Sequence, residues 1–193
     1  DFISNISHEL RTPVNVINGM SDILTRGEAK KEVYAIKTAG IRLSNQIEDI
    51  KDYTECARRD LLLEKEDYMV TSLINDVVTS YRAMDNRGNL ELIVDLSPNV
   101  PIILNGDIKK LHKIFRHLVG NAVKFTKEGG IYLKVYSEEF KYGINLVIEV
   151  TDTGIGMSRE EMNNASLGLY QGNKKRNRST GGIGLGLSVV YGF

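Results

Sequence analysis

Apolar residues recur every three or four positions along the first 60 residues. With Ile3 taken as heptad position a, apolar residues occupy successive a positions and the d positions between them: Ile3, Leu10, Ile17 and Leu24, with Ile6, Pro13 and Met20. This spacing predicts an amphipathic helix that ends at Gly27. A second helix is predicted from apolar residues seven positions apart, Ile36, Leu43, Ile50 and Ala57. Two such helices form an all-α hairpin, and apolar faces this broad favour a dimeric four-helix bundle.

The pattern changes after residue 61, where short apolar runs predict strands. We expect strands at Leu61–Glu66, Leu90–Leu96, Ile131–Val135 and Ile144–Val150. A helix face runs from Val70 to Tyr81, and Asp107 is typical of the N-cap of a further helix. Strands mixed with helices that do not cross over between strands predict an α+β two-layer sandwich. The chain therefore divides into residues 1–60 and residues 61–193.

The composition narrows the range of partners. The chain has 193 residues, of which 25 are basic and 25 acidic, and this zero net charge gives no support to a nucleic acid partner. The single cysteine, Cys56, excludes an internal disulfide and a cysteine-built metal site, and it favours a reducing compartment. No apolar run is long enough to span a bilayer. The chain starts without methionine and ends at Phe193 in an apolar helical run, so we expect a C-terminally incomplete piece of a longer protein.

The first candidate for chemistry lies on the first predicted helix. In the heptad numbering His8 falls at position f, farthest from the apolar stripe, where an imidazole is open to a second domain or macromolecule. The adjacent Glu9 could orient the ring or take its proton, and Thr12 lies one turn later on the same face. A zinc protease helix would need a histidine in place of Thr12. A solvated surface histidine is the alternative reading.

The second candidate ends the helix that follows Asp107. The amide oxygen of Asn121 suits a hard cation such as Mg²⁺, the ammonium of Lys124 suits a phosphate, and the ring of Phe125 could contact a base or ribose. Solvated surface residues would account for the same pattern, so both readings stay open.

The third candidate directly follows a buried strand. The carboxylate of Asp152 can accept a hydrogen bond from an exocyclic amine, and Gly154 and Gly156 let the backbone approach a flat ring. A plain strand-to-turn connection would use the same residues.

The fourth candidate is a segment rich in cations and glycine, with a helix predicted at Leu185–Val190 behind it. Its residues include Lys174, Lys175, Arg176, Gly182, Gly184 and Gly186. Glycine amides at a helix N-terminus bind anions, and a basic loop would screen a polyphosphate. A solvated loop is the alternative. The sequence has neither a Walker lysine motif nor G-x-G-x-x-G, so it supports neither a P-loop nor a Rossmann site.

Taken in order, these motifs resemble the sequence boxes of the bacterial sensor histidine kinases of two-component signalling. Residues 2–13 resemble the H box almost letter for letter, and residues 121–126 resemble the N box. Residues 152–157 and 182–187 resemble the two glycine boxes. The resemblance covers nearly the whole chain. It implies a dimerisation and histidine-phosphotransfer hairpin followed by a Bergerat-fold ATP-binding domain, the fold shared with gyrase, MutL and heat-shock chaperones.

The resemblance also implies roles for single residues. His8 is then the phosphoacceptor, Glu9 its acid–base partner, and Thr12 positions water for dephosphorylation of a response regulator. Asn121 would ligate Mg²⁺, and Asp152 would read the adenine amino group of ATP. The implied nucleotide site comprises Asn121, Lys124, Phe125, Asp152, Gly154, Gly156, Gly182, Gly184 and Gly186. The cations of the fourth candidate, Lys174, Lys175 and Arg176, are expected to join it.

The implied function is ATP-dependent autophosphorylation of His8 and transfer of the phosphoryl group to a response-regulator aspartate. The implied partners are a second copy of the chain, through the N-terminal hairpin, and a receiver domain. The region would be the cytoplasmic domain of a membrane-anchored sensor that meets the membrane only through parts absent from this chain. The alternatives are a protein that acts mainly as a response-regulator phosphatase, and a non-catalytic dimeric scaffold.

Two positions depart from the family pattern. His117 stands where the N box usually has an asparagine four residues before the metal-binding one, so an imidazole replaces an amide. The usual phenylalanine-rich box of the lid reads Leu167-Gly168-Leu169-Tyr170. We expect the first departure to affect nucleotide affinity or its pH dependence, and the second to affect docking of the lid.

Overall fold

The computed structural model describes residues 2–24, 30–58, 61–84, 90–166 and 184–193. Contacts within the chain define two compact units, one of Asp1–Leu61 with Glu160–Gly192 and one of Leu62–Arg159 with Phe193. Residues Glu160–Gly192 thus group with the N-terminal helices. The division into domains at residues 60 and 61 stays a prediction.

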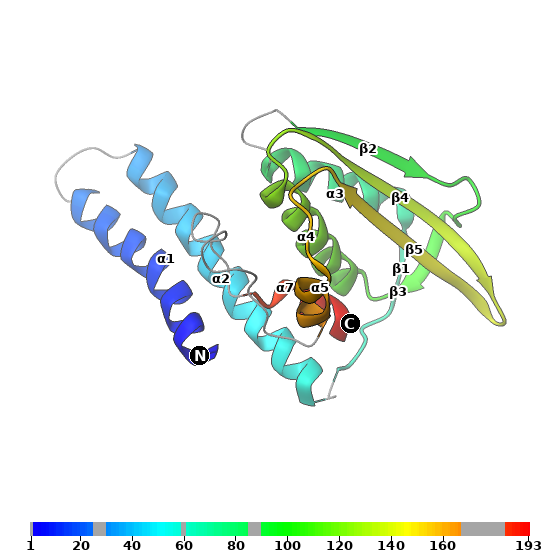
Figure 1. The fold of residues 1–193 in the computed structure, drawn as a ribbon, viewed down its shortest axis with the longest axis horizontal. Helices are drawn as coiled ribbons and strands as arrows, with labels where there is room; N and C mark the ends of the chain where they lie inside the picture. The colour runs from blue at the N-terminus through cyan, green and yellow to red at the C-terminus, as the bar shows by residue number, and fades with distance from the viewer. Residues whose placement is uncertain (1, 25–29, 59–60, 85–89, 167–183) are drawn as a thin grey trace. The chain divides into compact units, whose positions relative to one another are not determined.

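The first unit is built on two long helices, α1 over Phe2–Leu24 and α2 over Lys30–Arg58, which pack along each other (Figure 1). The prediction of a helical hairpin is confirmed. Pro13 lies inside α1 and its ring is buried. This residue withholds one backbone hydrogen bond from the helix, but it fills the d position that the heptad assigns to the apolar stripe.

The hairpin leaves large apolar side chains in contact with solvent. The exposed side chains on α1 and α2 are Val14, Ile23, Val33, Tyr34, Ile41 and Ile47. Tyr34 is 72 % exposed and Ile41 and Ile47 are each 54 % exposed. The two helices together therefore leave part of their apolar surface uncovered.

Two short helices belong to the later part of the chain, α5 over Arg159–Ser166 and α7 over Gly186–Gly192. Helix α7 confirms the helix predicted behind the glycine run, and Leu185, directly before it, and Val189 within it are both buried. Helix α5 was not predicted. Of the helices in the described part of the chain, none has both the length and the apolar character needed to cross a bilayer.

The second unit contains a sheet with the strand order β2-β4-β5, formed by Leu90–Leu96, Gly129–Phe140 and Gly143–Asp152. Strands β4 and β5, at the two strands predicted there, pair as an antiparallel hairpin. Strand β2 pairs with β4 in parallel, from Leu90↔Gly129 to Leu96↔Val135. The prediction that no helix crosses over was therefore wrong. Parallel strands cannot be joined by a tight turn, and the chain reaches β4 from β2 through helix α4 over Ile108–Phe125.

A separate two-stranded ribbon joins β1, Glu66–Met69, to β3, Ile103–Gly106, in antiparallel register. The strand predicted at Leu61–Glu66 was wrong, because pairing begins only at Glu66. The backbone before it is held by side chains at the start of α4 instead of by a neighbouring strand. Strand β3 was missed because Pro98 and Pro101 made its surroundings resemble a loop.

Helix α3, Val70–Met84, and helix α4 cover one face of the sheet (Figure 1). The inward side chains of β4 are almost fully buried against them, and the core set includes Leu73, Val77, Phe115, Val119, Ile131, Leu133 and Val135. The predicted two-layer sandwich is confirmed. This packing fixes α4 on the sheet along its buried face.

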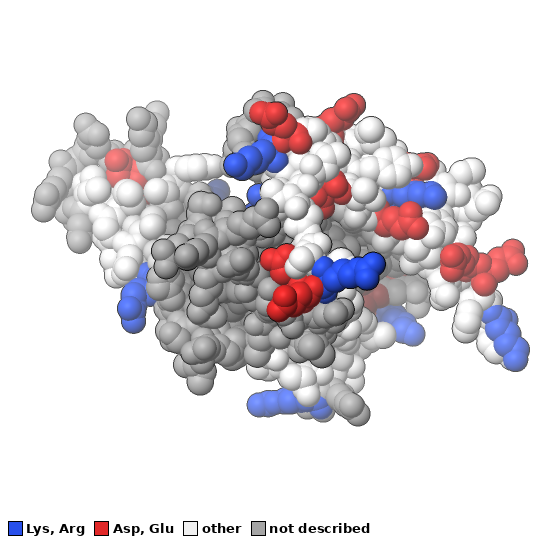
Figure 2. All heavy atoms as spheres, in the orientation of Figure 1, with Lys and Arg blue, Asp and Glu red and all other residues white. Residues whose placement is uncertain are grey.

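The opposite face of the sheet is polar. Tyr132 donates a hydrogen bond of 2.7 Å to Asp95 Oδ2, and Tyr136 donates one of 2.9 Å to Glu149 Oε1. These bonds stabilise the neutral phenols, so the pKa values of both tyrosines are raised. Figure 2 shows acidic and basic side chains interspersed over this unit. The sheet therefore has one apolar and one solvated face, as an antiparallel hairpin on a helix layer requires.

Candidate functional site

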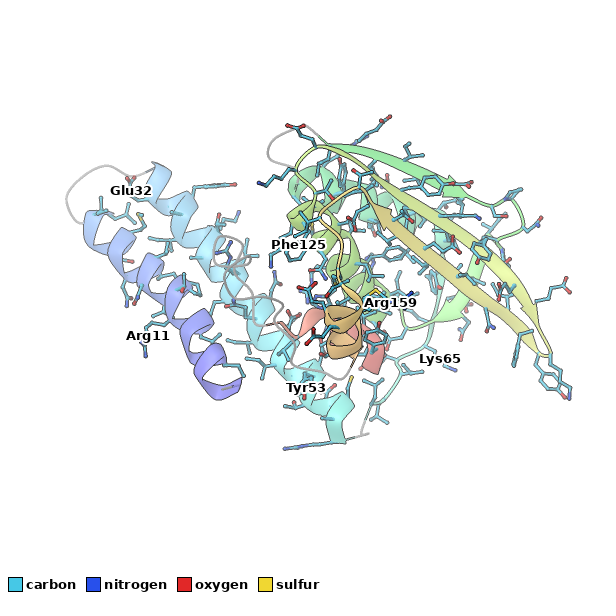
Figure 3. The ribbon with its side chains drawn as sticks, in the orientation of Figure 1. Arg11, Glu32, Tyr53, Lys65, Phe125 and Arg159 are labelled. Carbon is cyan, nitrogen blue, oxygen red and sulfur yellow. The ribbon has the colours of Figure 1, made fainter. Side chains whose placement is uncertain are left out.

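Helix α4 carries the first group of predicted site residues on its last turn. The Asp107 side chain caps the start of the helix by accepting a hydrogen bond of 3.0 Å from the Lys110 N–H. At the other end, the Thr126 N–H donates to the Ala122 carbonyl. Because Ala122 is buried in the core, Asn121 and Phe125 on neighbouring faces lie at its edge, half-buried. Phe125 is labelled in Figure 3 at the end of this helix.

Strand β5 delivers the second group of residues to the same place. The strand ends at Asp152, whose Oδ1 accepts a hydrogen bond of 2.8 Å from the Gly154 N–H. The next residue, Ile155, donates its N–H to the Phe125 carbonyl over 3.3 Å. The turn after β5 is therefore bonded directly to the end of α4. The structure brings together the N-box residues and the first glycine box, as their chemistry requires.

Gly154 is the residue that permits this approach. A Cβ at this position would lie 2.6 Å from the Phe125 carbonyl oxygen and 2.7 Å from Asp152 Oδ1. Both distances are shorter than real Cβ contacts, so any other residue would push the turn away from the helix. Glycine is favoured at position 156 for a different reason. The φ of Gly156 is 62°, in the left-handed region that other residues rarely adopt, and no atom crowds the position.

The site combines one exposed carboxylate with a nearby cation. Asp152 is exposed, and its Oδ1 lies 3.5 Å from the hydroxyl of Thr126, which is fully buried. The Lys124 ammonium lies over the Phe125 ring, 4.9 Å from its centre. An acceptor for an amine, an aromatic surface and a cation suited to an anion thus lie on two adjoining segments.

The donor set fits a magnesium ion held mainly by a ligand's phosphates. Within the described residues no three His, Cys, Asp or Glu side chains are grouped as a metal site. Asn121 offers a half-buried amide oxygen, which is a hard donor. Mg²⁺ keeps several waters and needs only one or two protein oxygens when phosphates complete its shell. Asn121 alone is compatible with that mode of binding.

Several predicted site residues lie outside this description. Lys174, Lys175, Arg176 and Gly182, together with the lid box at residues 167–170, are not among the described residues, and neither are the side chains of His8 and Glu9. The backbone of residue 8 is helical within α1, and Thr12 is exposed on that helix. Gly184 and Gly186 lie in the other unit, at and before the start of α7.

The sequence did not reveal which residues hold the turn after β5 in place. Thr153 accepts a hydrogen bond of 3.1 Å from the Gly130 N–H, and the Thr153 N–H donates to the Gly130 carbonyl over 3.2 Å. These bonds tie the turn after β5 to the start of β4. The sequence signal was present as a threonine between Asp152 and Gly154, but only the strand pairing gives it a partner.

Two family descriptions match the chain. Residues 1–55 match the His Kinase A (phospho-acceptor) domain, and residues 106–192 match the histidine kinase-, DNA gyrase B- and HSP90-like ATPase family. The chain belongs to the sensor histidine kinases. The family predicted from the H, N and glycine boxes is thereby confirmed.

Curated relatives of this histidine kinase region are much longer proteins. It is 30 % identical to the autoinducer 2 sensor kinase/phosphatase LuxQ of Vibrio cholerae, over 99 % of the chain and 23 % of that protein. It is 33 % identical to the sensor histidine kinase RcsC of Escherichia coli, over 97 % of the chain and 20 % of that protein. The chain therefore spans less than a quarter of these relatives.

Solved histidine kinase structures share the fold. The full-length kinase ShkA in complex with AMPPNP aligns with a TM-score of 0.68 and 23 % identity, covering 98 % of this chain and 39 % of that one. The histidine kinase AdeS of Acinetobacter baumannii aligns with a TM-score of 0.65 and 20 % identity, covering 96 % and 84 %. The predicted fold class, a helical hairpin followed by an α+β two-layer sandwich, is confirmed.

Proposed function

We propose that this region uses ATP to phosphorylate His8 and then passes the phosphoryl group to an aspartate of a response-regulator receiver domain. The observation that carries the proposal is the direct bonding of the turn after β5 to the end of α4, which joins Asp152 to Asn121, Lys124 and Phe125 in one place. The match of residues 1–55 to a phospho-acceptor domain supports the assignment of the acceptor to the hairpin.

The chemistry assigns a task to each group. A ring nitrogen of His8 attacks the γ-phosphorus, the bond to the β–γ bridging oxygen breaks, and ADP leaves. Glu9 accepts the proton of the other ring nitrogen as the N–P bond forms, so the phosphorylated ring is neutral. In the second step an aspartate oxygen takes the phosphoryl group, and the imidazole recovers a proton. Asp152 accepts from the adenine amino group, and Lys124 attracts phosphate. The catalysis is positioning and electrostatic stabilisation, as in other phosphoryl transfers.

We propose that Asn121 is the residue of this chain that binds Mg²⁺. When bound, the ion neutralises phosphate charge, and the amide oxygen of Asn121 is the donor that this chain contributes. The cations Lys174, Lys175 and Arg176 and the glycines 182, 184 and 186 complete the phosphate site in the proposal.

A second copy of the chain is the proposed partner of the hairpin. Exposed apolar side chains on α1 and α2, Ile41 and Ile47 among them, supply the surface that a four-helix bundle would bury. We further propose that the region lies on the cytoplasmic side of a membrane-anchored sensor, as the sensor names of its relatives suggest.

The test is labelling with ATP that carries a radioactive γ-phosphate. We expect the wild type to acquire acid-labile, alkali-stable phosphate, and His8→Gln to acquire none while it binds an ATP analogue normally in calorimetry. His112→Gln is the matched control, because His112 lies on α4 beside Asp76, with 3.7 Å between Nε2 and Oδ2, and is not among the residues to which the proposal gives a role. Acid-stable phosphate on a serine, or equal labelling of His8→Gln, would refute the assignment. A non-catalytic scaffold would bind no analogue.

A further inference from the structure

The backbone that enters the second unit is bonded to the start of α4. The Glu64 N–H donates a hydrogen bond of 2.9 Å to Asp107 Oδ2, while Asp107 Oδ1 accepts the Lys110 N–H that caps the helix. The Asp107 side chain is only 5 % exposed. One buried carboxylate therefore serves the helix with one oxygen and the incoming chain with the other.

Lys110 adds a second attachment to the same segment. Its ammonium donates a hydrogen bond of 3.0 Å to the Leu62 carbonyl and lies 3.2 Å from Asp107 Oδ2. The ammonium also lies 5.5 Å from the centre of the Phe193 ring. The Lys110 side chain is 18 % exposed, so most of it is buried, while its hydrogen bond to the Leu62 carbonyl lies at the exposed surface.

The neighbouring lysine makes a contrasting contact. Lys109 pairs with the Glu64 carboxylate over 2.8 Å, but the two side chains are 70 % and 72 % exposed. Such pairs contribute little because water and salt screen them and both side chains lose freedom. Lys110 holds backbone, whereas Lys109 holds only a solvated side chain.

Both residues that Lys110 contacts lie next to a point where the chain passes between the two units, and the third such point is at Arg159–Glu160. Leu62 is the first residue of the unit, and Phe193 follows Gly192, which belongs to the other unit. The far end of α4 carries Asn121, Lys124 and Phe125, and Figure 3 labels Lys65 in the attached segment and Phe125 at that far end. One rigid helix thus joins the chain connections to the candidate nucleotide site.

We infer that Lys110 is a positioning residue for the phosphoryl transfer, because it anchors on α4 the backbone that enters the catalytic unit after α2 and so limits the reach of the histidine-bearing hairpin. The inference rests on the proposed function. With the anchor in place, only residues 59–61 separate the end of α2 at Arg58 from fixed backbone. The anchor therefore keeps the effective concentration of His8 at the nucleotide high.

The size of the effect follows from the length of the connection. Without Lys110, the first fixed backbone group is the Glu64 N–H, and the connection grows to residues 59–63. Without the Asp107 acceptor as well, it grows to residues 59–65, up to the start of β1. Effective concentration falls roughly as the −3/2 power of length, which gives losses of about twofold and about three- to fourfold.

Three variants of the whole chain test the inference. We expect Lys110→Met to lower the initial rate of autophosphorylation about twofold, and Lys110→Met with Asp107→Asn to lower it about three- to fourfold. Asparagine keeps the oxygen that caps α4 but replaces the acceptor of the Glu64 N–H by an amide nitrogen. The Michaelis constant for ATP should stay the same, since the nucleotide residues lie at the other end of the helix. Lys110→Arg, which keeps the charge and donors, should restore the rate.

Lys109→Met is the matched control, and we expect it to label at the wild-type rate. Equal losses in the Lys109 and Lys110 variants, an unchanged rate in Lys110→Met, or a loss confined to the ATP Michaelis constant would overturn the inference. Hydrogen exchange of the Glu64 amide tests the anchor without any kinase assay, and it should speed up in the double variant. A wild type that never labels would refute the proposed function, and unaltered exchange would refute the anchor.

Discussion

Replacing Gly154 by alanine should separate the two segments that make up the nucleotide site. The new Cβ would lie 2.6 Å from the Phe125 carbonyl oxygen, and ordinary contact begins at 3.4 Å. The turn must therefore retreat by roughly 0.8 Å, because the Phe125 carbonyl belongs to the backbone at a helix end and cannot rotate away. The Ile155 N–H bond to Phe125, already 3.3 Å long, would then be lost.

The cost can be assembled from its parts. Overpacking of a close contact costs about 1 to 3 kcal/mol, and the lost hydrogen bond costs about 1 kcal/mol more. We expect Gly154→Ala to lower the free energy of unfolding by about 2 to 4 kcal/mol in urea titrations followed by circular dichroism. Calorimetry with an ATP analogue should show at least about tenfold weaker binding, since Asp152 and Phe125 would be moved apart.

Two other glycines distinguish this clash from general effects of alanine. Gly143→Ala, at the start of β5 with no atom within 4 Å of the new Cβ, should change stability by less than about 0.5 kcal/mol. Gly156→Ala meets no atom either but must hold a φ of 62°, which costs about 1 kcal/mol. Wild-type stability and affinity in Gly154→Ala would show that the turn does not depend on its contact with α4.

Two further predictions concern groups on α4. Burial raises the pKa of Asp107, but the hydrogen bonds from the Lys110 and Glu64 amides and the Lys110 ammonium outweigh it and hold that pKa below its usual value of 3.8. The ionised carboxylate therefore stabilises the fold above about pH 4, and this contribution is lost as the pH falls through the lowered pKa. Asp107→Asn should cost about 1 to 2 kcal/mol at pH 7 in urea titrations, and the difference from wild type should shrink below pH 4; a constant difference would contradict this account. His117→Asn should strengthen Mg²⁺-dependent binding of an ATP analogue and reduce any preference for Mn²⁺ over Mg²⁺, because an amide oxygen replaces an imidazole one turn before Asn121; calorimetry with each cation measures this, and identical affinities in both proteins would contradict it.

The linear sequence determined the elements whose signals are local. The heptad of α1 and α2, the alternation of β4 and β5, and the cap at Asp107 each depend on residues within one or two turns of each other. The H, N and glycine boxes can also be recognised from the sequence alone, since each is a short run of residues whose chemical character does not depend on distant partners. These features sufficed to predict the hairpin, the sandwich and the family.

Tertiary structure alone decided which distant segments meet. The parallel pairing of β2 with β4, and the pairing of β1 with β3, join segments far apart in the chain, and no local pattern encodes the partner of a strand. The apolar run after residue 60 resembled a strand, yet its backbone bonds are taken by Asp107 and Lys110, more than 40 residues later. Gly154 was predicted for its approach to a ligand, whereas its nearest constraint is the Phe125 backbone. The sequence gives the chemistry of each side chain, but which residues become its neighbours is decided only when distant segments pack together in the folded core.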